Sequence, residues 1–143
     1  ALEPILADGY PLKAGAMEIL EFLEARGMPC ALATSSTTSV PEKLQRNAID
    51  SYFQAVVTRD DVAHGKPHPD IYLAAAERLR VTPDRCLAVE DSKPGLLSAQ
   101  AAGLRVVHVP DIAVIEAAVT DNCTAIFPDL LALRDWLAHI DQM

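Results

Sequence analysis

The chain has 143 residues, half of them hydrophobic, and its 20 acidic residues against 12 basic ones give a net charge of -8. A chain of this size forms one core, and its negative charge argues against a surface that binds nucleic acid or an anionic membrane. No apolar run reaches the ~20 residues of a membrane-spanning helix. Any bound anion therefore needs a local site.

The three cysteines, Cys30, Cys86 and Cys123, are odd in number, widely spaced and set in apolar segments. This usage is typical of buried thiols in a reducing compartment and not of a disulfide framework. The first residues also lack the charged and then apolar pattern of a signal segment. We therefore expect a cytoplasmic protein.

Helical and strand patterns alternate along the chain, with short connections and no repeats. Helices are predicted at residues 16–26, 39–48, 71–79, 94–102, 113–118 and 128–140. Strands are predicted at residues 29–33, 55–58, 86–89, 105–109 and 125–127. Gly27 and Gly103 read as helix stops, and Trp136 as a core residue. The alternation predicts an α/β fold, with a Rossmann-like parallel sheet and helices on both faces.

Polar residues follow the predicted strands at three places: Thr34 to Ser36, the loop with Lys66, and Glu90-Asp91. Each has an ordinary structural reading, as a hydroxyl-rich loop, a solvated lysine, or acidic residues before a helix. Ligands of such sheets bind at the carboxyl ends of the strands. Together a hydroxyl, an ammonium and two carboxylates at that edge suit phosphoryl transfer with Mg²⁺.

Three segments carry a family resemblance: ALATSS, GKPHPDIYLAAAERL and CLAVEDSKPGLLSAQAAG. In order and spacing they resemble the later motifs of the haloacid dehalogenase-like hydrolases, above all the phosphatases and phosphomutases with an early helical cap. The resemblance implies that Thr34 and the Ser35 amide bind the phosphoryl group, and that Lys66 steadies it and the attacking carboxylate. It also implies Mg²⁺ bound directly by Asp91, with Glu90 acting through water or a neighbouring contact.

The same family begins with a strand that carries Asp-x-Asp, whose first Asp attacks phosphorus, and this chain contains no Asp-x-Asp. Its one early aspartate, Asp8, follows no strand-like run. By analogy with the family, we expect residues 1–10 to end a helical cap and residues 11–143 to form the core without its first central strand. We therefore expect a fragment, whose natural partner is the missing strand and cap segment.

The function implied by the resemblance is Mg²⁺-dependent hydrolysis of a small phosphate monoester, such as a sugar phosphate. It would proceed through an aspartyl-phosphate in the full-length protein, and this chain alone is expected to be inactive. A phosphosugar mutase stays open, as does a haloacid dehalogenase, although the latter needs no metal and the Glu90-Asp91 pair counts against it. A receiver-like or non-catalytic phosphate-binding module is the alternative from another class, although receivers place their acidic pair first.

Other polar residues are given structural roles. Asp60-Asp61 reads as a solvated turn, and Pro67 between His64 and His68 prevents a two-histidine metal face on a helix. His108 and His139 are assigned to packing. The chain contains neither GxxxxGK[ST] nor GxGxxG, the usual nucleotide-binding loops.

Overall fold

The fold was analysed in a computed structural model, which describes residues 3–7, 14–36, 40–46, 48–110 and 115–141. Its strands form one parallel sheet in the order β3-β2-β1-β4-β5-β6. They are β1 (Glu3–Ala7), β2 (Ala31–Ala33), β3 (Ala55–Val57), β4 (Cys86–Glu90), β5 (Arg105–His108) and β6 (Ala125–Ile126). The predicted α/β fold with a parallel sheet is confirmed.

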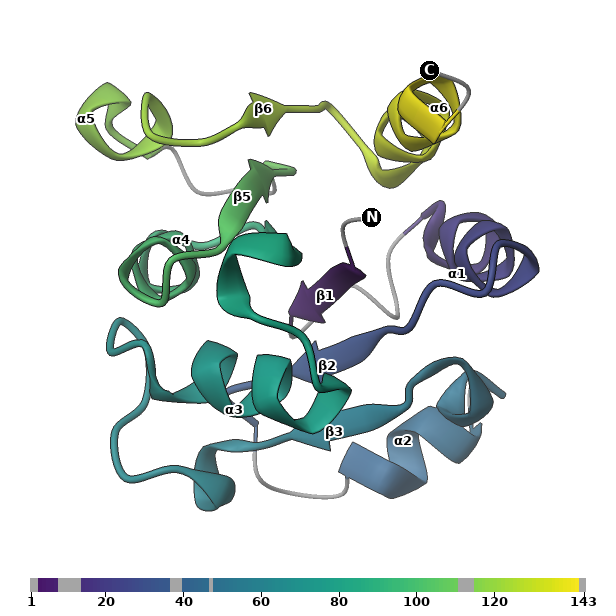
Figure 1. The fold of residues 1–143 in the computed structure, drawn as a ribbon, viewed down its shortest axis with the longest axis horizontal. Helices are drawn as coiled ribbons and strands as arrows, with labels where there is room; N and C mark the ends of the chain where they lie inside the picture. Colours follow the sequence, from purple (N-terminus) through teal and green to yellow (C-terminus); the bar gives the residue numbers. More distant parts are fainter. Residues whose placement is uncertain (1–2, 8–13, 37–39, 47, 111–114, 142–143) are drawn as a thin grey trace.

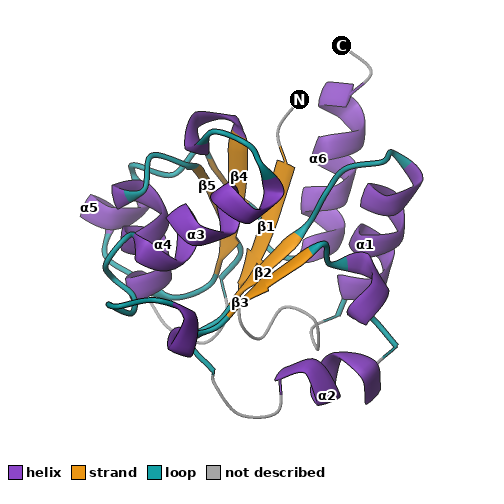
Figure 2. Cartoon of the chain, turned by 60° about the horizontal axis from the view of Figure 1, so that its bottom comes forward, coloured by secondary structure: helices purple, strands orange, loops and turns teal. Residues whose placement is uncertain are grey.

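Helices cover both faces of this sheet (Figures 1 and 2). They are α1 (Ala16–Ala25), α2 (Val40–Arg46), α3 (Asp70–Leu79), α4 (Lys93–Ala101), α5 (Ala117–Thr120) and α6 (Leu130–Asp141), with short 3-10 turns at η2 (Asp50–Tyr52), η3 (Arg59–Asp61) and η4 (Pro83–Arg85). Helices α3 and α4 lie on one face, and α1 and α6 on the other. None of the helices among the described residues has the length and apolar character that crossing a membrane requires.

Strands β2 and β4 are buried on both faces, which explains their unbroken apolar runs. In β4, Leu87 and Val89 pack on the side of α1 and α6, whereas Cys86 and Ala88 face α3 and α4. The alternation follows from the two-residue period of a strand. The strand residues that face α3 and α4 include the small side chains of Ala31, Ala33, Cys86 and Ala88.

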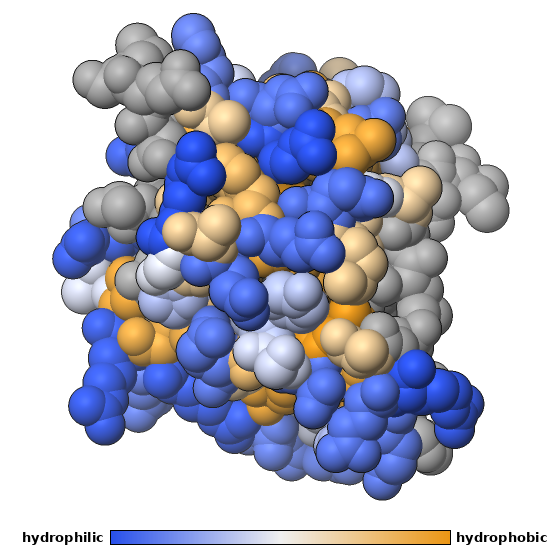
Figure 3. Space-filling model, turned by 90° about the vertical axis from the view of Figure 1, so that its right-hand side faces the viewer, coloured by the Kyte–Doolittle hydropathy of each residue, from blue (hydrophilic) through white to orange (hydrophobic). Residues whose placement is uncertain are grey.

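The surface over α1 and α6 is mostly hydrophilic, with apolar side chains in small separate areas (Figure 3). The apolar stripes of these helices point inward, where Ile19, Leu23 and Leu133 are fully buried. Trp136, predicted to be a core residue, is half-buried at the margin of that cluster, with its ring 5.4 Å from that of Phe127. The net negative charge is thus carried by a solvated outer layer.

Glycines end two helices as predicted. Gly27 follows α1 and Gly103 follows α4, with φ angles of 66° and 87°. The Gly103 amide donates to the Gln100 carbonyl, and the next amide, Leu104, donates to Ala99, which is the Schellman pattern. Each of these glycines thus lies in a short loop that connects its helix to the next strand, β2 after α1 and β5 after α4.

The N-terminal segment differs from the prediction. We expected residues 1–10 to be helical and the central position of the sheet to be empty, but Glu3–Ala7 forms β1, between β2 and β4. Ile5 is in register with Ala31 on one side and with Ala88 on the other. Two facing strand edges with unpaired backbone groups favour a third strand between them, and this outweighs the weak local pattern. The next residue, Asp8, lies outside the described residues.

Candidate functional site

Lys66 and Glu90 form a buried ion pair where β2 and β4 end. The Lys66 Nζ atom lies 2.8 Å from Glu90 Oε1 and donates a second hydrogen bond of 3.2 Å to the carbonyl of Ala33, the last residue of β2. The two side chains are only 6% and 1% exposed. The ammonium also lies 5.3 Å from the centre of the Tyr72 ring, within range of a cation–π contact. The loop lysine predicted from sequence is therefore not solvated.

Burial controls the charge of Glu90. Desolvation raises the pKa of its carboxyl above the usual 4.5, while Lys66 lowers it and the nearby Asp91 adds to the increase. Its Oε2 atom is buried with no hydrogen-bond partner among the described residues. A buried carboxylate is costly unless it is paired, and Lys66, with a smaller contribution from Tyr72, offsets part of the desolvation that raises the Glu90 pKa.

Gly95, in the first turn of α4, makes room for this carboxylate. A Cβ atom at Gly95 would overlap both Glu90 oxygens. The sequence analysis did not single out Gly95, although a glycine just inside a helix is a known sign of close approach. The identity of this residue follows from the ion pair and not from the helix, where glycine is unfavourable.

We predict that Gly95→Ala destabilises the chain by about 1–3 kcal/mol, because the new methyl group displaces the Glu90 carboxylate. In the background of Glu90→Ala the overlap is gone, and the same substitution should be neutral or stabilise the helix by about 0.5–1 kcal/mol. Urea unfolding of the wild type, the two single variants and the double variant measures the change in stability in each background. An equal loss in both backgrounds would mean that Glu90 is not the obstacle.

Thr34 follows β2 directly and is buried, while Ser35 is exposed. The Thr34 amide donates to the Val57 carbonyl of β3, and its Oγ1 accepts a 3.1 Å hydrogen bond from the Ser36 amide. Because that oxygen acts as an acceptor here, the hydroxyl proton can still be donated. The structure thus places Thr34 next to Ala33, whose carbonyl holds Lys66.

Asp91 is half-buried and directly follows β4, beside Glu90. Its carboxylate is close enough to raise the Glu90 pKa. Among the residues that the structure describes, no group of three or more His, Cys, Asp and Glu side chains is placed to hold a metal ion. Asp91 and Glu90 alone would therefore offer an ion an incomplete set of protein oxygens.

His108 also meets this cluster, from β5. It is buried, pairs in register with Glu90, and its Nδ1 lies 3.1 Å from the Glu90 carbonyl oxygen. His108 is a packed, buried residue as predicted. Its contact is with the backbone of Glu90, whose side chain binds Lys66. His139, on α6, is exposed.

Asp61 is part of a capped turn, as predicted for Asp60-Asp61. Its Oδ2 accepts 2.8 Å and 3.2 Å hydrogen bonds from the amide and hydroxyl of Thr58, and Arg78 lies 3.7 Å from Oδ1. The backbone hydrogen bond from Thr58 is the main reason that the pKa of Asp61 is lowered. This carboxylate therefore stabilises the turn after β3.

Asp61→Ala should cost about 1 kcal/mol of folding stability at pH 7, as expected for a lost cap. Because the native pKa is lowered, the charge contributes fully above the usual 3.8 and its contribution declines as the pH falls through the native value. The difference between wild type and variant should therefore narrow in acid. Thermal unfolding from pH 7 to strongly acidic pH tests this, with the exposed neighbour Asp60→Ala as control. A difference that stays constant with pH would contradict it.

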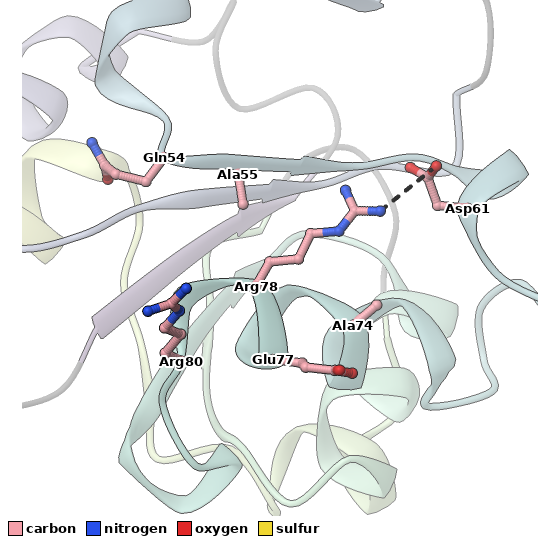
Figure 4. Close-up of a pocket in the computed structure, with 7 residues that line it drawn as sticks. All are labelled: Gln54, Ala55, Asp61, Ala74, Glu77, Arg78 and Arg80. Carbon is pink, nitrogen blue, oxygen red and sulfur yellow. Dashed lines mark ion pairs between the residues drawn. The ribbon is translucent and has the colours of Figure 1, made fainter.

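A separate pocket lies along the outer edge of the sheet, between β3 and the end of α3 (Figure 4). Arg78 extends from α3 toward Asp61, and its guanidinium donates a 2.6 Å hydrogen bond to the Val56 carbonyl of the edge strand. The pocket contains none of the predicted site residues. Its positive charges are partly used within the chain, so the Lys66–Glu90 cluster is the better candidate site.

Comparison with known proteins identifies the family to which this chain belongs. The family model of the haloacid dehalogenase-like hydrolases matches residues 3–103. A bifunctional riboflavin kinase/FMN phosphatase of Arabidopsis thaliana is 40% identical over 100 residues, 68% of this chain and 26% of that protein. A phosphorylated carbohydrates phosphatase of Thermotoga maritima is 40% identical over 95 residues, 66% of this chain and 44% of that protein.

Solved structures show the same fold. The structure of CbbY from Rhodobacter sphaeroides in complex with phosphate is 30% identical and superposes with a TM-score of 0.76. The match covers 85% of this chain and 55% of the CbbY chain. The chain spans half or less of the length of the two phosphatases. The match over residues 3–103 includes Thr34, Ser35, Lys66, Glu90 and Asp91, and the chain belongs to the haloacid dehalogenase-like hydrolases.

Proposed function

We propose that the full-length protein hydrolyses a small phosphate monoester, and that Thr34, Ser35 and Lys66 bind its phosphoryl group. The observation that carries this proposal is the buried Lys66–Glu90 pair beside Thr34, which fixes a cation at the carboxyl end of the sheet. A fixed cation and hydroxyl in a site with little water stabilise the charge that develops on phosphate oxygens. Phosphatases among the relatives support the same reaction.

The attacking group is not one of the residues described above. In the family it is the first Asp of Asp-x-Asp, a pattern that does not occur in these 143 residues. We therefore propose that the reaction needs a segment that carries this motif, and that the chain alone is inactive. Lys66 would hold both the phosphoryl group and the attacking carboxylate, while the Thr34 hydroxyl and the Ser35 amide donate to phosphate oxygens.

A Mg²⁺ ion fits the chemistry of the residues present. Asp91 supplies a carboxylate at the end of β4, and oxygen ligands are those that Mg²⁺ prefers. Glu90 uses Oε1 for Lys66 and has its other oxygen buried against Gly95, so it is not a direct ligand and would act on the ion through a neighbouring contact. When bound, the ion would neutralise charge on the phosphate. Asp91 would be its direct ligand from this chain.

The substrate class proposed is a phosphorylated sugar or related metabolite, as the name of the phosphorylated carbohydrates phosphatase of Thermotoga maritima indicates for that relative. The three cysteines are free thiols, two of them buried, which supports a reducing compartment, and we place the protein in the cytoplasm.

The test is phosphate release by the full-length protein from a panel of sugar phosphates, with Mg²⁺ and after its removal by a chelator. We expect turnover that is lost with the chelator and restored by Mg²⁺. Release of halide from a 2-haloacid, unaffected by the chelator, would instead identify a dehalogenase. Turnover by the 143-residue chain that disappears in Asp8→Asn would overturn the assignment of the attacking group.

A further inference from the structure

Ser98 makes a buried contact that the proposed reaction does not yet use. It lies on α4, is fully buried, and its hydroxyl donates a 2.6 Å hydrogen bond to the carbonyl of His68. Its helix neighbours Leu96 and Ala99 are apolar and fully buried. A hydroxyl in such surroundings is costly unless it is paired, so the bond to His68 accounts for its position.

The carbonyl that accepts from Ser98 belongs to His68, the last residue of the turn that carries Lys66. The His68 amide donates a 3.0 Å hydrogen bond to the Gly65 carbonyl, so residues 65–68 form one tight turn with Lys66 at its second position. From this turn the Lys66 side chain reaches Ala33 on β2 and Glu90 on β4. A shift of the turn would move the ammonium away from both acceptors.

The same helix also determines where Glu90 lies. Gly95 precedes Ser98 by three residues, which puts the two on one face of α4, and it leaves the space that the Glu90 carboxylate fills. Gly95 thus admits the carboxylate and Ser98 anchors the lysine turn. We propose that Ser98 is a positioning residue, whose hydroxyl holds the turn of residues 65–68 so that Lys66 meets Glu90 and the phosphoryl group. The effect of Ser98 on turnover rests on the proposed function, whereas its effect on the Lys66–Glu90 pair does not.

The first test uses the 143-residue chain and needs no activity. The coupling free energy between Lys66→Met and Glu90→Gln is measured by urea unfolding in three backgrounds: wild type, Ser98→Ala and Ser98→Cys. Cysteine has the shape of serine with a somewhat larger sulfur in place of the oxygen, and its thiol is only a weak donor. We expect the coupling to fall by more than half in both variants. Coupling that survives in either would show that the hydroxyl does not position Lys66.

A matched control separates positioning from a general loss of stability. Leu133→Ala removes a buried side chain of α6 on the opposite face of the sheet and destabilises the chain. It should leave the coupling between Lys66 and Glu90 unchanged. Equal loss of coupling in Leu133→Ala would reduce Ser98 to one contributor among many to stability and overturn the proposal.

The second test uses the full-length protein. Ser98→Ala should lower kcat about tenfold with little change in KM, because a misplaced lysine weakens the transition state more than the bound substrate. Leu133→Ala should keep the wild-type kcat at a temperature where both are folded. If the wild type releases no phosphate, the proposed function fails, whereas the coupling measurement still decides the role of Ser98. If coupling is lost while kcat is unchanged, the catalytic part of the proposal is wrong.

Discussion

Glu90→Ala is expected to lower the free energy of unfolding of this chain by about 3–5 kcal/mol. The reason is that the substitution leaves the Lys66 ammonium, 6% exposed, without the carboxylate 2.8 Å away. The Ala33 carbonyl and the Tyr72 ring remain, but neither carries a negative charge. Equilibrium urea unfolding followed by circular dichroism measures the loss.

Two comparisons show whether this loss comes from a stranded charge. Adding Lys66→Met to Glu90→Ala should recover part of the stability, because no unpaired charge is then buried. The surface pair of Lys93 and Glu116 is the matched control, since both of its side chains are about half exposed. Glu116→Ala should change stability little. Equal effects of Glu90→Ala and Glu116→Ala would contradict a buried pair.

Lys66→Met should reduce the kcat of the full-length protein about 100- to 1000-fold, as expected when one preorganised charge is removed from a transition state. The Lys66 ammonium is held in place by its hydrogen bonds to the Ala33 carbonyl and the Glu90 carboxylate, at the ends of two strands. Steady-state phosphate release measures the effect. The loss should lie mainly in kcat, because the charge on the phosphoryl oxygens is largest in the transition state.

Arg134→Met is the control for this loss of positive charge. Arg134 lies on α6 and pairs with the adjacent Asp135 at the surface. It should keep wild-type kinetics. A Lys66→Met enzyme that is folded, as judged by its thermal unfolding, and retains more than a third of the wild-type kcat would remove Lys66 from the reaction.

Much of this site could be predicted from sequence, because it depends on strand ends. Thr34 and Glu90 lie where apolar runs stop, and in a parallel sheet those ends share an edge. The partner of Lys66 could not be predicted in this way. It lies 24 residues away, and the contact depends on the path of the turn at residues 65–68 and on the space left by Gly95. The sequence therefore predicted Glu90 near a metal ion, and the structure shows its carboxylate paired with Lys66.

The error at the N-terminus has a different cause. Residues 3–7 contain the apolar run Ile5 to Ala7, but Glu3 and Pro4 precede it and leave a strand pattern of only three residues, and local pattern was all that the sequence offered there. The structure places them between β2 and β4, where both edges need hydrogen-bond partners. Pairing with two neighbours outweighed local preference. Ser98 was missed for a similar reason, since its carbonyl partner comes from a loop 30 residues away.

The central claim is that a phosphoryl group binds at the end of β2, beside Lys66. The most direct measurement is a titration of the isotope-labelled 143-residue chain with inorganic phosphate and Mg²⁺, followed by the amide signals in two-dimensional NMR. We predict saturable shifts at Thr34 and Ser35, reduced in Lys66→Met, and no shift at the pocket beside Arg78 and Arg80. Shifts confined to that pocket, or none at Thr34, would contradict the account.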